Sequence, residues 1–174
     1  MSDFWVFGYG SLMWRPAFDH VEAVPARLAG AHRALCVYSW VHRGTKEQPG
    51  LVLGLDRGGS CRGVAYRVAA AKRAQVMAYL RERELVTNVY REVSRPILLL
   101  GAKHRRAAAV TFVVDRDHVQ YAGRLPFARV LRLVRAGKGA AGANAEYVIN
   151  TATHLQSLGI RDLILERLAQ ELAG

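Results

Sequence analysis

The sequence predicts an α+β domain around a mainly antiparallel or mixed sheet, one that could close into a small barrel. Strand-like segments dominate the first part of the chain, and helix-like segments fill the final third. Regular alternation of strands and helices, the pattern of a parallel sheet, is absent. At 174 residues the chain has the length of one domain, so we expect a single domain over residues 1–174.

The strands are predicted from β-branched and aromatic residues bounded by turn residues. The first strand ends at Gly8, and the apolar segment 107–114 is typical of a strand covered on both faces. The pair Gly58-Gly59 predicts a tight turn, so the residues on either side are expected to form a hairpin. The predicted strands span residues 4–7, 26–41, 51–57, 61–68, 93–100 and 107–114, with a polar loop at 42–50.

The helices are predicted from apolar spacing and from capping residues. The first runs from residue 69 to about residue 84, because Val76, Tyr79 and Leu80 share one face. The alanine- and glycine-rich residues 136–143 are expected to form a flexible connection between two later helices. Those helices and the last one are expected to begin at Pro126 and run to about Arg135, at Asn144 and run to Leu158, and at Asp162.

Composition excludes several classes of protein. Hydrophobic residues make up 51% and charged residues 22%, and no uncharged apolar run approaches the roughly 18 residues of a membrane span. The N-terminal residues show no export signal, so we expect a cytoplasmic protein with no membrane partner. Cys36 and Cys61 lie in apolar stretches without metal-ligand spacing, and both are expected to be small buried hydrophobes.

The formal net charge of +11 raises the question of nucleic-acid binding. The arginines are spread over the whole chain, and the densest region, residues 81–106, alternates with glutamates and apolar residues. This pattern favours a solvated basic surface, and no nucleic-acid partner is expected. The same charge would raise the rate at which small anions encounter the protein.

Glycines interrupt the chain in two motifs, and neither is a nucleotide loop. Residues 137–142 fit GxGxxG but follow a predicted helix, where a dinucleotide site needs a strand. Residues 7–12, Phe-Gly-Tyr-Gly-Ser-Leu, fail that pattern and lack the lysine of a phosphate loop. Their glycines could let successive N–H groups point together at an anion such as a carboxylate. The alternative is an ordinary strand end, with Ser11 capping a helix over residues 12–18.

Glu84 lies where a predicted helix gives way to residues of strand character. A carboxylate at such a junction can be half buried, and burial raises its pKa toward the range of a useful base. The alternative is an exposed glutamate that pairs with Arg81 or Lys72 on the helix surface. Sequence spacing leaves both open.

A third group of polar residues has an ordinary explanation as well as a functional one. Asn144 as a cap, with Glu146 in the first turn, is normal chemistry for a helix start. Tyr147 could belong to the core or could offer its hydroxyl to a ligand. Arg43 and Tyr121 lie in predicted loops, where exposure to solvent is the default.

Taken as an ordered set, the motifs resemble those of the ChaC-type γ-glutamylcyclotransferases. The resemblance spans nearly the whole chain, and the later motifs resemble the glutathione-specific branch. Ala122, Arg124 and Val148 depart from the residues usual in that family. The matching motifs are residues 7–12, Trp14-Arg15-Pro16, His42-Arg43-Gly44, Gly63-Val64-Ala65-Tyr66, Arg83-Glu84 six residues before Tyr90, Tyr121-Ala122-Gly123 and Asn144-Ala145-Glu146-Tyr147.

This resemblance implies a small mixed β-barrel flanked by helices and a reaction that releases 5-oxoproline from a γ-glutamyl compound. In the glutathione-specific branch the substrate is glutathione and the second product is cysteinylglycine. The resemblance makes Glu84 the general acid/base and implies no metal or organic cofactor. It also implies that substrate is bound by Arg43, Tyr121, Tyr147 and the main chain of Val6, Phe7, Gly8, Tyr9, Gly10, Ser11 and Leu12.

Two other functions remain open at this point. The first keeps the chemistry but uses a different γ-glutamyl amine or amide as the substrate. The second is a non-catalytic anion- or RNA-binding module that uses the basic surface. The absence of an aromatic RNA-binding motif counts against that module. The sequence makes no prediction about an oligomer.

Overall fold

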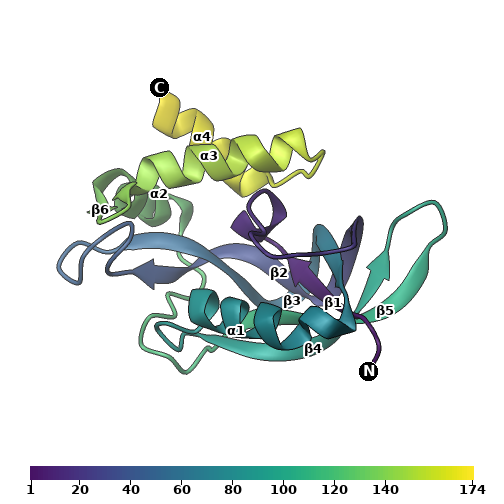
Figure 1. Ribbon diagram of the computed structural model, residues 1–174. Helices are drawn as coiled ribbons and strands as arrows, with labels where there is room; N and C mark the ends of the chain where they lie inside the picture. The colour runs from purple at the N-terminus through teal and green to yellow at the C-terminus, as the bar shows by residue number, and fades with distance from the viewer. The chain divides into compact units, whose positions relative to one another are not determined.

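The computed structural model describes all 174 residues and contains a closed five-stranded barrel and four α-helices (Figure 1). Strand order around the barrel is β1-β3-β2-β4-β5. β1 runs parallel to β5, whereas the β1–β3, β2–β4 and β4–β5 pairs are antiparallel, so the barrel is mixed. The predicted α+β class with a small mixed barrel is confirmed. The strands are β1 (Phe4–Gly8), β2 (Glu22–Ser39), β3 (Gly50–Val68), β4 (Tyr90–Leu99) and β5 (Arg105–Val114).

Two compact units divide the chain. The first comprises residues 1–33 and 55–118, and the second comprises residues 34–54 and 119–174. The first unit holds β1, β4, β5 and the helix α1 (Arg73–Glu84). The second holds α2 (Phe127–Ala136), α3 (Asn144–Ser157) and α4 (Leu163–Ala173). Each of the long strands β2 and β3 contributes residues to both units, and the single domain over 1–174 stays a prediction.

The core of the first unit joins α1 to the sheet. A 3-10 turn, Ala70–Lys72, leads into α1, whose apolar stripe packs against β1, the end of β3 and the middle of β5. Leu12, which follows β1, is buried in the same cluster, so the residues after β1 are packed against α1. The buried members are Phe4, Val6, Leu12, Val68, Val76, Met77, Leu80 and Phe112.

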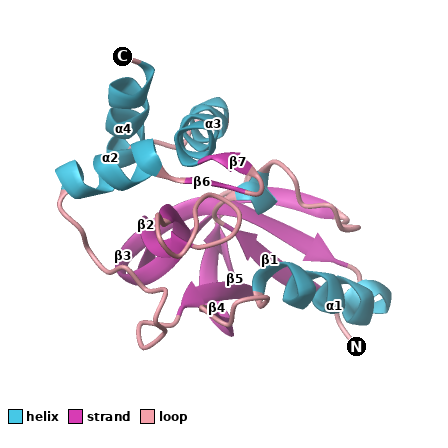
Figure 2. Cartoon of the chain, turned by 90° about the vertical axis from the view of Figure 1, so that its left-hand side faces the viewer, coloured by secondary structure: helices cyan, strands magenta, loops and turns pink.

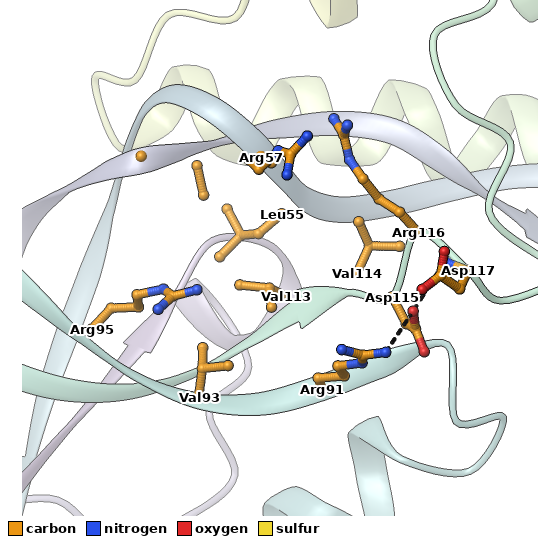
Figure 3. Close-up of a pocket in the computed structure, with 12 residues that line it drawn as sticks. Leu55, Arg57, Arg91, Val93, Arg95, Val113, Val114, Asp115, Arg116 and Asp117 are labelled. Carbon is orange, nitrogen blue, oxygen red and sulfur yellow. Dashed lines mark hydrogen bonds and ion pairs between the residues drawn. The ribbon is translucent and has the colours of Figure 1, made fainter.

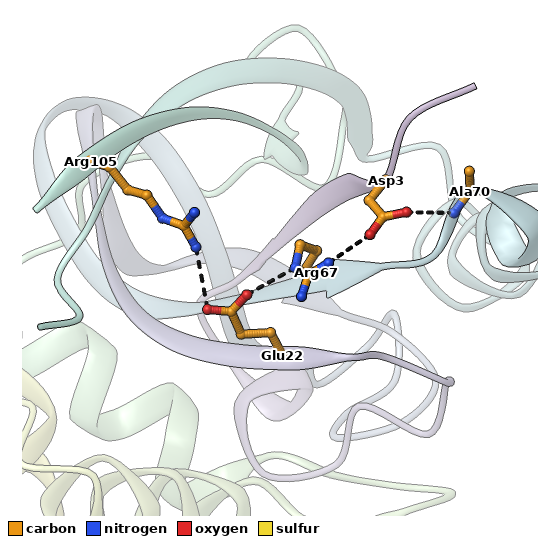
Figure 4. A network of polar contacts seen from close by, with 5 residues as sticks. All are labelled: Asp3, Glu22, Arg67, Ala70 and Arg105. Atoms are coloured by element: carbon orange, nitrogen blue, oxygen red, sulfur yellow. Dashed lines mark hydrogen bonds and ion pairs between the residues drawn. The ribbon is translucent and has the colours of Figure 1, made fainter. Parts of the chain in front are cut away.

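A chain of polar contacts ties together the N-terminal residues, β2, β3, β5 and the 3-10 turn before α1 (Figure 4). Arg67 is at its centre, 2.7 Å from Asp3 Oδ2 and 2.9 Å from Glu22 Oε2. Asp3 also accepts a hydrogen bond from the Ala70 N–H at 3.1 Å, and Arg105 reaches Glu22 at 3.3 Å. These groups are partly exposed to solvent, so the ion pairs add little to stability.

The predicted hairpin at Gly58-Gly59 is wrong. β3 continues through this pair as one strand from Gly50 to Val68. Gly58 has φ 101° and Gly59 has φ 69°, and across from them His32 Nδ1 lies 2.9 Å from the Gly58 carbonyl oxygen of the same unit. Positive φ angles bend a strand at a bulge as readily as they reverse it in a turn. The pair therefore bends β3 where the sequence alone suggested a reversal.

In the second unit α2, α3 and α4 pack on one another, coloured green to yellow in Figure 1. Two of their starts follow the sequence prediction. Pro126 immediately precedes α2, and Asp162 caps α4 by accepting a hydrogen bond from the Leu165 N–H at 3.1 Å. The shared apolar faces include the buried residues Val130, Val134, Val148, Leu155, Leu165 and Leu168.

Residues 136–143 have regular structure where a flexible connection was expected. After α2, the chain forms β6 (Lys138–Gly139) and β7 (Gly142–Ala143), a short antiparallel pair that leads into α3 (Figure 2). Gly142 has φ 115°, which a residue with a side chain adopts only with strain. Gly142 therefore serves the tight turn between the two short strands, whereas a Cβ on Gly139 would overlap the Val41 carbonyl oxygen.

Gly63 lies where β3 closely approaches the end of β1. A Cβ built on Gly63 would overlap the Gly8 carbonyl oxygen and lie 2.8 Å from Phe7 Cζ. Overpacking of this kind costs about 1–3 kcal/mol. We therefore expect Gly63→Ala to lower the free energy of unfolding by about that amount in urea denaturation.

The matched control is Gly101→Ala. Gly101 is exposed, and a Cβ there would meet only Val24 Cγ1 at an ordinary 3.4 Å. We expect this variant to unfold within about 0.5 kcal/mol of the parent. Equal stability of the two variants would contradict the close approach of β3 to β1.

Candidate active site

β1 ends in a turn whose main chain is held by side chains from β2 and β3. We call residues 6–12 the glycine turn. Arg33 Nε donates to the Tyr9 carbonyl at 2.7 Å. The Tyr66 hydroxyl lies 2.8 Å from the Leu12 carbonyl oxygen and 2.9 Å from that of Met13, and donates to one of them at a time. Burial raises the pKa of Tyr66 to about 12, so this donor keeps its proton at physiological pH.

Within the glycine turn the bulky side chains point into the protein. Val6, Phe7, Tyr9 and Leu12 are buried, whereas Ser11 is exposed and Gly10 is half-buried. The chain then makes a 3-10 turn over Ser11–Met13, so the helix over 12–18 that formed part of the alternative interpretation is absent. Gly10 takes the cap position without a side-chain bond, so Ser11 does not act as a helix cap. Within this turn, solvent therefore reaches mainly Gly10 and Ser11.

Glu84 is the last residue of α1, and its side chain is 18% exposed. Burial raises the pKa of its carboxyl group, and the neighbouring Arg83 offsets part of this rise. The alternative pairing with Arg81 or Lys72 does not occur. Arg81 binds Glu92 at 2.7 Å and Lys72 binds Asp19 at 3.3 Å. Glu84 is thus a largely buried acid whose cationic neighbour is Arg83, the residue before it on α1.

Arg83 connects the end of α1 to the glycine turn. Its Nη2 donates to Ser11 Oγ at 2.6 Å, and its Nη1 donates to the Arg15 carbonyl at 2.8 Å and the Tyr79 hydroxyl at 3.0 Å. Its Nε lies 3.7 Å from Glu84 Oε1. The first unit therefore brings Glu84 and the glycine turn into one polar network. Sequence reasoning assigned no role to Arg83, although it adjoins Glu84 in the motif.

Arg43 and Tyr147 form a cluster of their own in the second unit. The Arg43 guanidinium lies 5.5 Å from the centre of the Tyr147 ring and donates to the Ala143 carbonyl at 3.2 Å. The Tyr147 hydroxyl accepts a hydrogen bond from the Leu53 N–H at 3.0 Å. Tyr121 is half-buried and is placed by a β-bridge to Val37. Of the three residues predicted to bind substrate here, the structure brings Arg43 and Tyr147 into contact.

The predicted capping role of Asn144 is wrong. Ala143 occupies the cap position of α3, and Asn144 is the first, fully buried residue of the helix. Its side-chain amide pairs with the backbone of Leu51, accepting from the N–H and donating to the carbonyl, both at 2.8 Å. Asn144 therefore anchors the start of α3 to β3, a long-range role that its local sequence does not reveal.

Other features of the chain bear on the sequence predictions. Cys36 and Cys61 are buried and form no disulfide, as predicted. No group of three or more His, Cys, Asp and Glu side chains is arranged to hold a metal ion. None of the helices combines the length and the apolar character that crossing a membrane requires.

Comparison with known proteins identifies the family. Residues 4–173 match the family model described as ChaC-like protein. The chain belongs to the ChaC-like family. It is 36% identical over 158 residues to the glutathione-specific γ-glutamylcyclotransferase of Escherichia coli strain K12, covering 91% of this chain and 68% of that protein. It is 31% identical over 157 residues to glutathione-specific γ-glutamylcyclotransferase 1 of Homo sapiens, covering 89% and 71%.

The ChaC-like chain also shares its fold with a solved structure. A crystal structure of a γ-glutamyl cyclotransferase specific to glutathione from yeast superposes with a TM-score of 0.86. The alignment covers 99% of this chain and 96% of the yeast chain at 21% sequence identity. At this identity the likeness shows the fold alone.

Replacing Arg83 tests the electrostatic part of the network. Arg83 holds the pKa of Glu84 below the level that burial alone would give, so Arg83→Met should raise the pKa of Glu84 further. The carboxyl carbon of Glu84, followed by NMR during a pH titration, measures this change. Arg81→Met, two residues earlier on α1, removes a guanidinium bound to Glu92 and should leave the Glu84 titration in place. A downward shift in Arg83→Met would contradict the network.

Burial of Glu84 also predicts a pH-dependent effect on stability. Between its unfolded and its raised folded pKa, the folded protein keeps a proton on Glu84 that the unfolded chain has lost. The contribution of Glu84 to the free energy of unfolding is therefore greatest at low pH, and it falls as the pH rises from the unfolded to the folded pKa. Glu84→Gln removes the effect, so relative to the parent this variant should gain stability from acidic to neutral pH.

Urea denaturation of the parent and of Glu84→Gln at several pH values measures the difference. Glu82→Gln is the control, because it removes an exposed carboxylate from the same helix and leaves the buried Glu84 in place. A stability difference between Glu84→Gln and the parent that shrinks toward neutral pH would show that Glu84 is not buried in solution.

Proposed function

We propose that this ChaC-like chain is a glutathione-specific γ-glutamylcyclotransferase, which converts glutathione into 5-oxoproline and cysteinylglycine. The observation that carries the proposal is a buried acid with a raised pKa, Glu84, in one polar network with the glycine turn. Membership of the ChaC-like family and the names of its bacterial and human relatives support the same reaction.

The proposed reaction is intramolecular. The α-amine nitrogen of the γ-glutamyl group attacks its own γ-carbonyl carbon and closes a five-membered ring, and the bond to the cysteinyl nitrogen breaks. From ammonium to lactam the attacking nitrogen loses two protons, and the departing amide nitrogen gains two as it becomes the ammonium of cysteinylglycine, so no water is consumed and nothing is oxidised. Because both reacting groups belong to one molecule, holding the glutamyl chain folded back supplies much of the rate enhancement.

Glu84 is the proposed proton carrier. An α-amine with a pKa of about 8 is largely protonated at pH 7 and cannot attack until a base removes a proton. Burial raises the pKa of the Glu84 carboxyl group and so brings it closer to neutral pH. A pKa near the working pH favours both accepting a proton from the amine and donating one to the departing nitrogen. Glu84 would take the proton from the amine and return it to the departing nitrogen.

The glycine turn is proposed to bind the α-carboxylate of the substrate through main-chain N–H groups. Two features support this role: its bulky side chains are buried, and Arg33 and Tyr66 bind its carbonyl groups. Arg43, Tyr121 and Tyr147 are proposed to bind the rest of the tripeptide, where a guanidinium suits a carboxylate. A cytoplasmic location is proposed as well, because glutathione maintains the reducing state of the cytosol.

The decisive experiment incubates the purified chain with glutathione and follows 5-oxoproline and cysteinylglycine by mass spectrometry. We expect product with the parent and a loss of about 10²–10⁴-fold in kcat for Glu84→Gln, the usual contribution of a general acid/base. Glu82→Gln, which neutralises an exposed glutamate of the same helix, should retain parental activity.

Other outcomes change the proposal in defined ways. Equal turnover by Glu84→Gln would remove Glu84 from the mechanism. Turnover of other γ-glutamyl amines or amides in preference to glutathione would keep the chemistry and replace the substrate. No product from any γ-glutamyl compound, with folded protein, would overturn the enzymatic function.

A further inference from the structure

The first unit contains a pocket that lies apart from the glycine turn and Glu84. Its volume is about 290 Å³, and its walls come from β2, β3, β4 and the end of β5 (Figure 3). Neither Glu84 nor any residue of the glycine turn lines it. Pockets of about 300 Å³ lie at the lower end of the range for small-molecule sites, so this one suits a compact ligand.

The pocket exists because two barrel strands separate. β2 pairs with β4 through Ala26–Leu28 and Ile97–Leu99, whereas β4 goes on pairing with β5 as far as Tyr90. β2 turns away at Gly30, which has φ 87° and has no atom within 4 Å of the place where a Cβ would lie. The opening is therefore built into the path of the strands.

Apolar side chains form the floor of this opening, and arginines surround it. Leu55, Val93 and Val113 lie between the charged groups in Figure 3. The arginines are Arg57 from β3, Arg91 and Arg95 from β4, and Arg116 from the segment after β5. A concave site lined by charges of one sign concentrates ions of the other sign.

Two of the four arginines already have carboxylate partners. Arg91 lies 3.0 Å from Asp115 and Arg116 lies 2.8 Å from the buried Asp56. The Asp117 N–H and Arg91 lower the pKa of Asp115, so this acid stays ionised and keeps its arginine engaged. These pairs leave little of their charge for a ligand.

Arg57 and Arg95 differ from Arg91 and Arg116, because they have no carboxylate partner. Neither side chain makes a hydrogen bond or an ion pair, and they belong to different walls, β3 and β4. Both guanidinium groups are drawn at the edge of the apolar floor in Figure 3. The Asp117 carboxylate at the rim weakens the positive potential but leaves these two cations without a partner. A guanidinium binds carboxylate and phosphate oxygens through two parallel hydrogen bonds.

We propose that this pocket is a second ligand site, which binds a small dianion with a short apolar body between Arg57 and Arg95. A dicarboxylate or a phosphate monoester has this chemistry. The volume equals about ten water molecules at roughly 30 Å³ each, which limits the ligand to a small metabolite. The site is independent of the proposed cyclotransferase reaction, because it shares none of that reaction's residues.

The test measures binding of succinate and of methyl phosphate by isothermal titration calorimetry, with potassium chloride at equal ionic strength as the reference. We expect saturable binding of at least one dianion. Arg57→Gln/Arg95→Gln should weaken it by at least about tenfold, since hydrogen bonds to charged groups are the strong ones. Both arginines lack partners, so this double variant should fold like the parent in urea denaturation.

The matched control is Arg27→Gln/Arg106→Gln. These arginines are exposed, lie opposite Leu98 of β4 on either side and do not line the pocket. The variant loses the same charge and should bind like the parent, as should Glu84→Gln. The relative affinities of succinate and methyl phosphate then assign the ligand to the dicarboxylates or the phosphate esters.

Two results would overturn the proposal. One is the absence of saturable binding of either dianion above the chloride reference. The other is equal weakening in the pocket variant and the control variant, which would reduce the effect to net charge. Because Glu84→Gln is part of the series, failure of this site and failure of the proposed enzymatic function are distinguishable.

Discussion

The apolar cluster shared by α1 and β1 is the constraint on which the candidate site depends. Leu80 of the helix and Leu12 after the strand are buried in the same core, so the last turn of α1 cannot move independently of the glycine turn. Arg83 also fixes the orientation of the end of α1, because it forms hydrogen bonds with Ser11 and Arg15, some seventy residues away in the sequence. Glu84 follows Arg83 at once. Its burial and its link to the turn through Arg83 therefore have the same physical origin, the docking of one helix.

Local chemistry predicted those parts of the fold that depend on neighbours in sequence. Asp162 caps α4 and Pro126 precedes α2 because capping acts over three or four residues. Gly58-Gly59 was misassigned because a bulge and a hairpin turn need the same positive φ, and only the partner strand decides between them. Asn144 was misassigned for a similar reason, since its amide satisfies Leu51 of a distant strand and not the start of its own helix.

The same distinction runs through the candidate site. The junction of helix and strand pointed to a half-buried Glu84, and the structure shows a side chain 18% exposed. The sequence could not indicate that Arg83 bridges to the turn, because its partners lie far away along the chain. The pocket around Arg57 and Arg95 also depends on register, since it opens where β2 leaves β4. The order of the motifs along the chain was enough to indicate the family. The contacts of Arg83 and the pocket depend on the three-dimensional fold, because their residues are far apart in the sequence.

Tyr66 gives the glycine turn an anchor that does not respond to pH. Its hydroxyl holds the carbonyls of Leu12 and Met13, and a pKa of about 12 keeps that hydrogen in place throughout the range in which enzymes are assayed. A bell-shaped rate profile measured on this chain would therefore have no contribution from deprotonation of the anchor.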